Sequence, residues 1–391
     1  MPRRPVTAAA AGRENAPAKA EIIADRSPGA TRIGLAEGLA GAAMLLGLVA
    51  VWVYAHADLT LSHYDAKAHL VVARRVLDSL TPGWKQIGAV WLPLPHLLNL
   101  VPVQVDVFYR TGASAVAISV LSFGLAAWAC ARLVLETTGS RPGALLAVLA
   151  LATSPDLLYL QATPMTEALL VGLTTLAVLL VVRWVEDPVR GRRRAAGAAI
   201  VLACLTRYEA WPVTAAALGL AAIAFLRRGV PPREAGVEVA RLALYPVLTV
   251  IAFLVQSRLT IGKWFVTGGF FVAENPDLGR PFKALGSVWW GSYSLYGYAV
   301  LLIGTAGASV LLLRALRERR HAASIAVLAL FATAALPWYA FFQGHPFRIR
   351  YMIPLLPALA VSAGIGVGLA SRRARWAVAA LAMILVAWQA R

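Results

Sequence analysis

The sequence predicts an all-α, polytopic membrane protein with about eleven transmembrane helices. Its 391 residues are 59% hydrophobic and only 14% charged, whereas soluble domains carry about 25% charged residues. Many apolar runs approach the roughly 20 residues that cross a hydrocarbon core. The net charge of +18 comes from short basic clusters between those runs, a pattern typical of cytoplasmic loops beside anionic lipid. The composition therefore argues against a nucleic-acid-binding protein.

The chain is expected to begin with a disordered cytoplasmic tail. Residues 1–33 are rich in Ala, Pro and Arg and lack apolar periodicity. The apolar run 34–54 is followed by AHA (55–57), which resembles a signal-peptidase site. Because this run is about 20 residues long, we interpret it as an uncleaved first helix. Residues 34–391 then form one transmembrane domain.

Ten further spans follow from hydropathy. The stretch 195–226 is read as two short helices, because a single helix would move two later arginine clusters to the opposite side of the membrane. The expected spans lie at roughly 111–135, 143–158, 167–185, 195–209, 211–226, 238–257, 296–313, 322–342, 351–370 and 374–390.

The arginine clusters set the expected orientation. With the N-terminus in the cytoplasm, the clusters at 190–194, 227–233, 314–320 and 372–375 all fall inside, as the positive-inside rule requires. The chain is thus expected to be a multi-pass protein of a bacterial-type inner membrane. Two long loops then lie on the outer face.

The outer loops are expected to lie against the membrane. Loop 56–110 contains an amphipathic stretch, 63–80, which predicts an interfacial helix ended by Pro82-Gly83. The segment WLPLPHLL (91–98) follows as a proline-broken, membrane-dipping segment. Loop 258–295 is rich in glycine and in aromatic residues that suit the headgroup level.

Asp65 is the candidate catalytic residue. It lies in the outer loop about ten residues beyond the first span, where a carboxylate can take a proton from an incoming hydroxyl. The alternative is a solvated aspartate or a helix N-cap.

No cofactor or metal is expected. Asp65 and His69 share a helical face, but His63 does not, and two ligands make a weak site for a divalent metal. The cysteines Cys130 and Cys204 lie inside apolar segments, so a thiolate metal site is not expected either.

Three residues are candidates for orienting the acceptor or the base. Glu167 opens a predicted span, and an ionisable group there is costly unless it is paired. The alternative is an acidic residue favoured in the first turn of a helix. His69 and His96, both in the first outer loop, are assigned the same orienting role.

Two arginines close to each other are candidates for binding phosphate. Arg348 and Arg350 are predicted outside, against the positive-inside bias, and guanidinium groups bind phosphate oxygens bidentately. Lys263 is a supporting donor. The alternative for the arginines is an interfacial headgroup anchor.

A further group of polar residues has two readings. Arg207 and Glu209 lie within an apolar stretch, so they form either a structural ion pair or a substrate contact. Tyr208, which lies between them, and Tyr351, which follows Arg350, are assigned the same alternatives.

The order of these motifs resembles the GT-C superfamily of membrane glycosyltransferases, in its branch of protein O-mannosyltransferases and lipid A aminoarabinose transferases. The resemblance covers most of 35–370 and includes Asp65 in the long first outer loop. The motifs that complete it are ARRVLDSLTPG (73–83), WLPLPHLL (91–98), the SP and TPMTE sequences within 154–167, TRYEAWP (206–212) and FRIRYMIPLLP (347–357).

The resemblance implies a donor and two roles. The family uses polyprenyl-phosphate sugars, its first-loop aspartate is the base, and arginines near the last outer loop hold the lipid phosphate. These roles correspond to Asp65, to Arg348 and, less directly, to Arg350. The sequence departs from the family at Ala66, where O-mannosyltransferases often have a second carboxylate, and in lacking a C-terminal soluble domain.

Residues and resemblance together predict an inverting glycosyltransferase at the outer face of the membrane. Its partners would be the bilayer, a polyprenyl-phosphate-linked sugar and a hydroxyl acceptor on a protein, lipid or glycan, with no nucleic acid. Two alternatives remain: a transporter or flippase of a lipid-linked anion, and a lipid-linked oligosaccharide polymerase or ligase.

Overall fold

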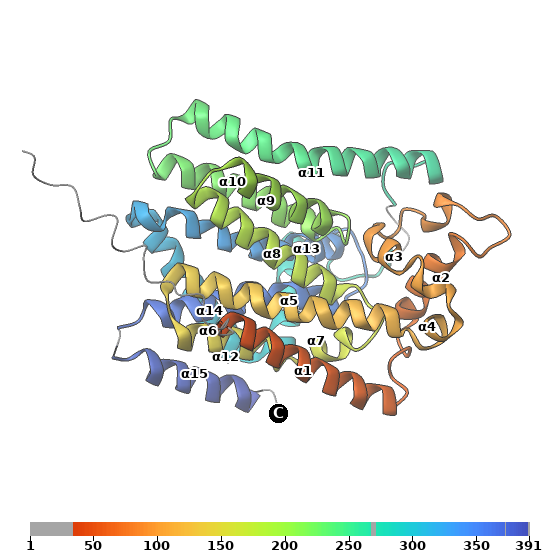
Figure 1. Ribbon diagram of the computed structural model, residues 1–391, viewed down its shortest axis with the longest axis horizontal. Helices are drawn as coiled ribbons and strands as arrows, with labels where there is room; N and C mark the ends of the chain where they lie inside the picture. Colours follow the sequence, from red (N-terminus) through yellow and green to blue (C-terminus); the bar gives the residue numbers. More distant parts are fainter. Residues whose placement is uncertain (1–33, 267–270, 372, 390–391) are drawn as a thin grey trace, which may run out of the picture. The chain divides into compact units, whose positions relative to one another are not determined.

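A computed structural model describes residues 34–266, 271–371 and 373–389, so the predicted tail 1–33 lies outside the described residues. The described chain is almost entirely helical (Figure 1). Its segments are α1 (Leu35–His56), α2 (Tyr64–Arg75), η1 (Trp84–Ile87), α3 (Leu94–Asn99), η2 (Pro102–Gln104), α4 (Asp106–Thr111), α5 (Ala113–Thr138), α6 (Arg141–Ala152), α7 (Pro155–Gln161), α8 (Glu167–Glu186), α9 (Arg190–Cys204), α10 (Ala210–Arg227), α11 (Pro232–Ile261), α12 (Pro281–Arg317), η3 (Arg319–Ala334), α13 (Ala335–Phe342), η4 (Ile349–Leu355), α14 (Leu356–Leu369) and α15 (Arg375–Gln389).

The long apolar helices make this a multi-pass membrane protein, although the count of eleven spans is not confirmed. Eight helical stretches in the described residues are long and apolar enough to cross a membrane. The pair α6 and α7 adds a ninth if the two count as one span, despite a bend of 67° between them. The other two expected spans correspond to α9 and α15, which are shorter than a full crossing.

Two helices form the centre of the bundle. Their apolar stretches are buried along 83% of α8 and 89% of the η4–α14 span, against 17% for α1 and α11. Close packing there depends on small residues: a Cβ added to Gly307 of α12 would lie 2.0 Å from the carbonyl oxygen of Ser362 in α14. The peripheral helices instead expose large apolar side chains, as lipid-facing surfaces do.

The stretch 195–226 is two helices, as expected. The chain turns between α9 and α10 at Thr206 to Glu209, and the two helices contact each other. At the far end of this pair, Arg228 donates a hydrogen bond to the carbonyl oxygen of Glu186 at the end of α8. Basic loops and the turn at 206–209 therefore lie at opposite ends of these helices.

One detail of the outer-loop predictions is wrong. The interfacial helix ends at Arg75, well before Pro82-Gly83, because the backbone turns at Val76 to Asp78. The segment 258–295 is helical at both ends, since α11 runs to Ile261 and α12 begins at Pro281. Figure 1 shows the short helices α2, α3 and α4 together at one end of the long helices.

Candidate active site

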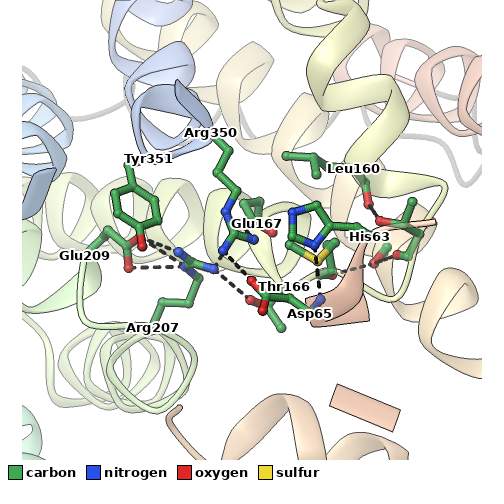
Figure 2. A network of polar contacts seen from close by, with 12 residues as sticks. His63, Asp65, Leu160, Thr166, Glu167, Arg207, Glu209, Arg350 and Tyr351 are labelled. Carbon is green, nitrogen blue, oxygen red and sulfur yellow. Dashed lines mark hydrogen bonds and ion pairs between the residues drawn. The ribbon is translucent and has the colours of Figure 1, made fainter. Parts of the chain in front are cut away.

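Five charged side chains from separate parts of the sequence form one continuous network (Figure 2). Arg207 Nη1 lies 3.0 Å from Glu167 Oε1, and Arg207 Nη2 lies 2.7 Å from Glu209 Oε1. Arg350 extends the network, because its Nη2 pairs with Asp65 Oδ2 and its Nη1 lies 3.6 Å from Glu167 Oε1. The predicted site residues from four segments thus meet at one end of the helices.

Asp65 is held at the start of α2. His63 caps this helix: its Nδ1 accepts a hydrogen bond from the backbone N–H of Asp65, at 3.1 Å. The positive end of the helix favours a carboxylate in this first turn. Burial, reinforced by the charge of Arg350, lowers the pKa of His63, so the ring is neutral and free to accept at neutral pH. Asp65 is only 6% exposed and points its Oδ2 at Arg350.

Glu167 is both the first residue of α8 and a member of the network, so both sequence readings apply to it. It is 0% exposed, and its Oε1 receives both arginines. Within the described part of the chain, its Oε2 is buried without a hydrogen-bond partner. An unsatisfied buried oxygen costs about 1–3 kcal/mol, more when it is charged. The other oxygen of the same carboxylate, Oε1, is the one that both arginines approach.

Arg207 joins the two glutamates and also donates to Thr166 Oγ1 at 3.1 Å. Burial alone would lower the pKa of Arg207, but the carboxylates of Glu209 and Glu167 outweigh burial and raise the pKa above its usual value. The guanidinium therefore stays charged, and the predicted ion pair with Glu209 is present.

Arg348 differs from Arg350 in its surroundings. Arg348 is exposed at the start of η4 and makes no ion pair with any described carboxylate. It is close enough to the network for its charge to contribute, after burial and Arg350, to the lowered pKa of His63. Tyr351, the next residue after Arg350, lies beside that guanidinium, 5.7 Å from ring centre to Cζ.

The two orienting histidines pair with each other and not with Asp65. His69 Nδ1 lies 3.1 Å from His96 Nε2, and the ring of Trp91 lies 4.4 Å from that of His69. Burial lowers the pKa of His96 to about 4, and burial followed by the neighbouring His96 lowers that of His69 well below its usual value. Because α2 turns the ring of His69 toward α3, its described hydrogen bond goes to His96 and not to Asp65, and its role in orienting the acceptor or the base stays a prediction.

Two comparisons with known proteins bear on this arrangement. A sequence model of the dolichyl-phosphate-mannose-protein mannosyltransferase family matches residues 100–253. The structure of ArnT from Cupriavidus metallidurans bound to undecaprenyl phosphate superposes with a TM-score of 0.59 at 17% identity, over 90% of this chain. The chain has the GT-C fold.

The match to ArnT covers most of this chain and a smaller share of the ArnT chain. The apo structure of the same ArnT gives a TM-score of 0.59 at 18% identity over 91% of this chain. This chain covers 64% of the length of each ArnT chain. No curated protein matches the sequence. The resemblance to the GT-C superfamily is confirmed at the level of the fold.

Within the GT-C fold, two predicted site residues stay outside the charged network. Tyr208 donates a hydrogen bond to the carbonyl oxygen of Ala89, at 2.9 Å, which fastens the first outer loop to the α9–α10 turn. Burial raises the pKa of Tyr208 to about 12, so its hydroxyl stays protonated. Lys263 is exposed just after α11 and forms no ion pair in the described ranges.

Three residues that contact the site were not predicted to do so from the sequence. Thr166 accepts a hydrogen bond from Arg207, and Trp91 packs against His69. His63 caps the helix that carries Asp65. Thr166 stands next to Glu167 in TPMTE, and a histidine directly before an acidic first turn is a capping signal. No group of three His, Cys, Asp or Glu side chains positioned to hold a metal ion occurs in the described residues.

Proposed function

We propose that this protein is an inverting glycosyltransferase that moves a sugar from a polyprenyl-phosphate donor to an acceptor hydroxyl. The observation that carries the proposal is the buried carboxylate of Asp65, held by Arg350, which also contacts Glu167. The fold supports it, because ArnT with the same fold was solved bound to undecaprenyl phosphate. The matching family is described as a dolichyl-phosphate-mannose-protein mannosyltransferase.

The chemistry assigns a role to each oxygen. Asp65 takes the proton of the acceptor hydroxyl, and the acceptor oxygen attacks the anomeric carbon from the side opposite the phosphate. The bond between that carbon and the phosphate oxygen breaks, and polyprenyl phosphate leaves with the electron pair. Phosphate is a good leaving group, so the reaction needs no second carboxylic acid of the kind that glycosidases use. Glu167, which Arg350 also contacts, orients the acceptor or the base.

Arg350 and Arg348 have different electrostatic roles in this proposal. Arg350 is already paired with Asp65 and Glu167, so it positions the base. Arg348 is exposed and free of carboxylates among the described residues, so it offers its fork of donors to the phosphate and offsets the charge that builds on it. Lys263, just after α11, supports phosphate binding when the donor reaches from the end of α11 to the start of η4.

The direct test is turnover by the wild-type protein. The purified chain, in a bilayer with radiolabelled polyprenyl-phosphate sugar and a mixture of candidate acceptors, should release polyprenyl phosphate. Transport of the intact donor across the bilayer without release would instead identify a flippase. Appearance of a longer lipid-linked glycan would identify a polymerase.

The network is proposed to face the outer side of an inner membrane, with the N-terminus in the cytoplasm. Cysteines introduced at Ser62 and Gln343, both exposed beside the network, should react with an impermeant thiol reagent added to intact cells. A cysteine at Gly191, exposed in the basic first turn of α9, should react only after the cells are opened. Cys130 and Cys204 are buried and should give little background. Labelling at Gly191 in intact cells would reverse this orientation.

Arg348 is expected to bind the phosphate, not the bilayer. Replacing Arg348 by alanine should weaken binding of polyprenyl phosphate by about 2–5 kcal/mol, since one partner of a charge-assisted pair is removed. Arg348→Lys keeps the charge but loses the bidentate fork, so its affinity should fall between those of wild type and Arg348→Ala. The measurement is binding of polyprenyl phosphate, without sugar, in neutral-lipid nanodiscs.

The matched control for Arg348 is Arg280→Lys, another exposed arginine, at the start of α12. This control should bind polyprenyl phosphate as wild type does. Equal affinities for wild type, Arg348→Lys and Arg348→Ala would leave Arg348 as a headgroup anchor and remove it from the mechanism.

A further inference from the structure

A second cavity lies where two helices break. The chain bends by 67° between α6 and α7, at Thr153-Ser154. Helix α12 breaks at Gly297, whose φ of 68° and ψ of 174° suit only glycine. Both breaks line one cavity of about 600 Å³, which Val386 and Trp388 of α15 border on another side. Broken membrane helices that line a cavity commonly form binding sites.

The cavity lies toward the end of the bundle that carries the charged network. Tyr159 of α7 packs its ring 5.2 Å from Tyr54, in the last turn of α1, and its hydroxyl lies 2.7 Å from Ser62 Oγ. Helix α12 continues from its break to Arg317, about the 20 residues that cross a hydrocarbon core. The cavity therefore lies near the depth of the lipid headgroups, where tyrosine and tryptophan are common.

Asp156 lines this cavity without a counter-ion. Its carboxylate makes no ion pair and accepts no side-chain hydrogen bond from any described residue, and no lysine or arginine is among the residues that line the cavity. Every carboxylate of the charged network, by contrast, has an arginine. Asp156 is exposed at the cavity, so its carboxylate is open to pair with a cation from outside the chain.

The aromatic residues of α12 indicate what kind of cation fits. Tyr293, Tyr296 and Tyr298 line the cavity with Asp156, and the rings of Tyr293 and Tyr298 lie 4.3 Å apart. Tyr296 uses its hydroxyl to donate to the carbonyl oxygen of Met352, which fixes its ring. A carboxylate surrounded by aromatic rings suits an alkylammonium group, through a charge-assisted hydrogen bond and cation–π attraction. The cavity also falls within the usual size of small-ligand sites.

We propose that this cavity binds the primary ammonium group of a membrane-lipid headgroup, with Asp156 as its counter-ion. The source is a lipid because the cavity is at headgroup depth and Trp388 and Tyr298 at its border are 67% and 50% exposed, open to the side of the bundle. The site is separate from Asp65, since Asp156 has no contact with the charged network. A soluble amine carries the same chemical group, and the experiment distinguishes the two.

The test is lipid selectivity. Wild-type protein is reconstituted with equal amounts of phosphatidylethanolamine and phosphatidylglycerol, extracted into mild detergent, and its retained lipid is measured by mass spectrometry. Wild type should retain phosphatidylethanolamine preferentially, and N-acetylated phosphatidylethanolamine, whose nitrogen is uncharged, should not be retained. Asp156→Asn should reduce this preference by about thirtyfold or more, because it removes one partner of a charge pair.

Two variants and one competitor complete the test. Asp156→Glu keeps the charge and should keep the preference. Asp187→Asn alters an exposed carboxylate beyond the end of α8 and should leave the preference unchanged. Absence of a preference in wild type, or an equal preference in Asp156→Asn, would overturn the proposal whatever the stability of the variants. If wild type binds ethanolamine from solution but retains no phosphatidylethanolamine, the ligand is a soluble amine and the lipid assignment fails.

Discussion

Replacing Asp65 by asparagine is expected to lower sugar transfer by about 10²–10⁴-fold, the usual contribution of a positioned general base. Asparagine has nearly the same shape, so it keeps the cap contact with His63 through the backbone. It cannot take a proton from the acceptor hydroxyl. Donor binding should change little, because the proposed phosphate ligand is Arg348. The measurement is release of polyprenyl phosphate at saturating donor, together with binding of polyprenyl phosphate.

The matched control for Asp65 is Asp78→Asn in the same loop. Asp78 is exposed and pairs with Arg74, outside the charged network, so this variant should transfer sugar at the wild-type rate. If Asp65→Asn kept more than about a third of wild-type activity, well outside the range of a general base, Asp65 would be structural. Arg350 would then be a partner in a structural ion pair only.

Replacing Arg207 by methionine is expected to destabilise the protein by about 3–5 kcal/mol, the cost of leaving buried charges without a partner. Glu167 and Glu209 are 0% and 2% exposed, and Arg207 pairs with both. Methionine fills much of the volume of the arginine stem, so the loss reports the charge more than the packing. The measurement is the free energy of unfolding in detergent, or the thermal midpoint where unfolding is irreversible.

Arg241→Met is the control for Arg207. Arg241 pairs with Glu238, but its side chain is 55% exposed, and an exposed pair contributes about 0–1 kcal/mol. Adding Glu167→Gln and Glu209→Gln to Arg207→Met should restore part of the lost stability, because no buried charge is then left unpaired. A similar small effect for Arg207→Met and Arg241→Met would mean that Arg207 holds substrate and not the fold.

The ion pair between Arg350 and Asp65 distinguishes Arg350 from Arg348. From the sequence, Arg348 and Arg350 are alike: both precede the same span and both stand against the charge bias. In the structure Arg350 is committed to two carboxylates, and Arg348 is exposed. This difference is the basis for proposing that Arg350 positions the base and that Arg348 binds the phosphate.

The class of fold and the end of the helices that carries the candidate site could be predicted from the sequence. Hydropathy is a local property, because each apolar run must bury its own backbone polar groups in a helix. Ten of the eleven expected spans coincide with a helix or with two consecutive helices, and hydropathy alone was enough to place them. The span expected at 296–313 differs, because α12 begins earlier, at Pro281. The expected topology places the arginine clusters at one end of the helices and the candidate site residues at the other end. The ion pairs agree with this placement, because they join Glu167 to Arg207 and Asp65 to Arg350.

Which of those residues contact one another could not be predicted from the sequence. Asp65 and Arg350 are 285 positions apart in the sequence, and their pairing depends on how α2 and η4 pack against the start of α8. The same packing turned His69 toward His96, ended α2 at Arg75, and placed Asp156 in the cavity beside two helix breaks. Local sequence fixes a helix and its polarity, but a side chain's partner depends on the packing and rotation of neighbouring helices, which many weak contacts set together.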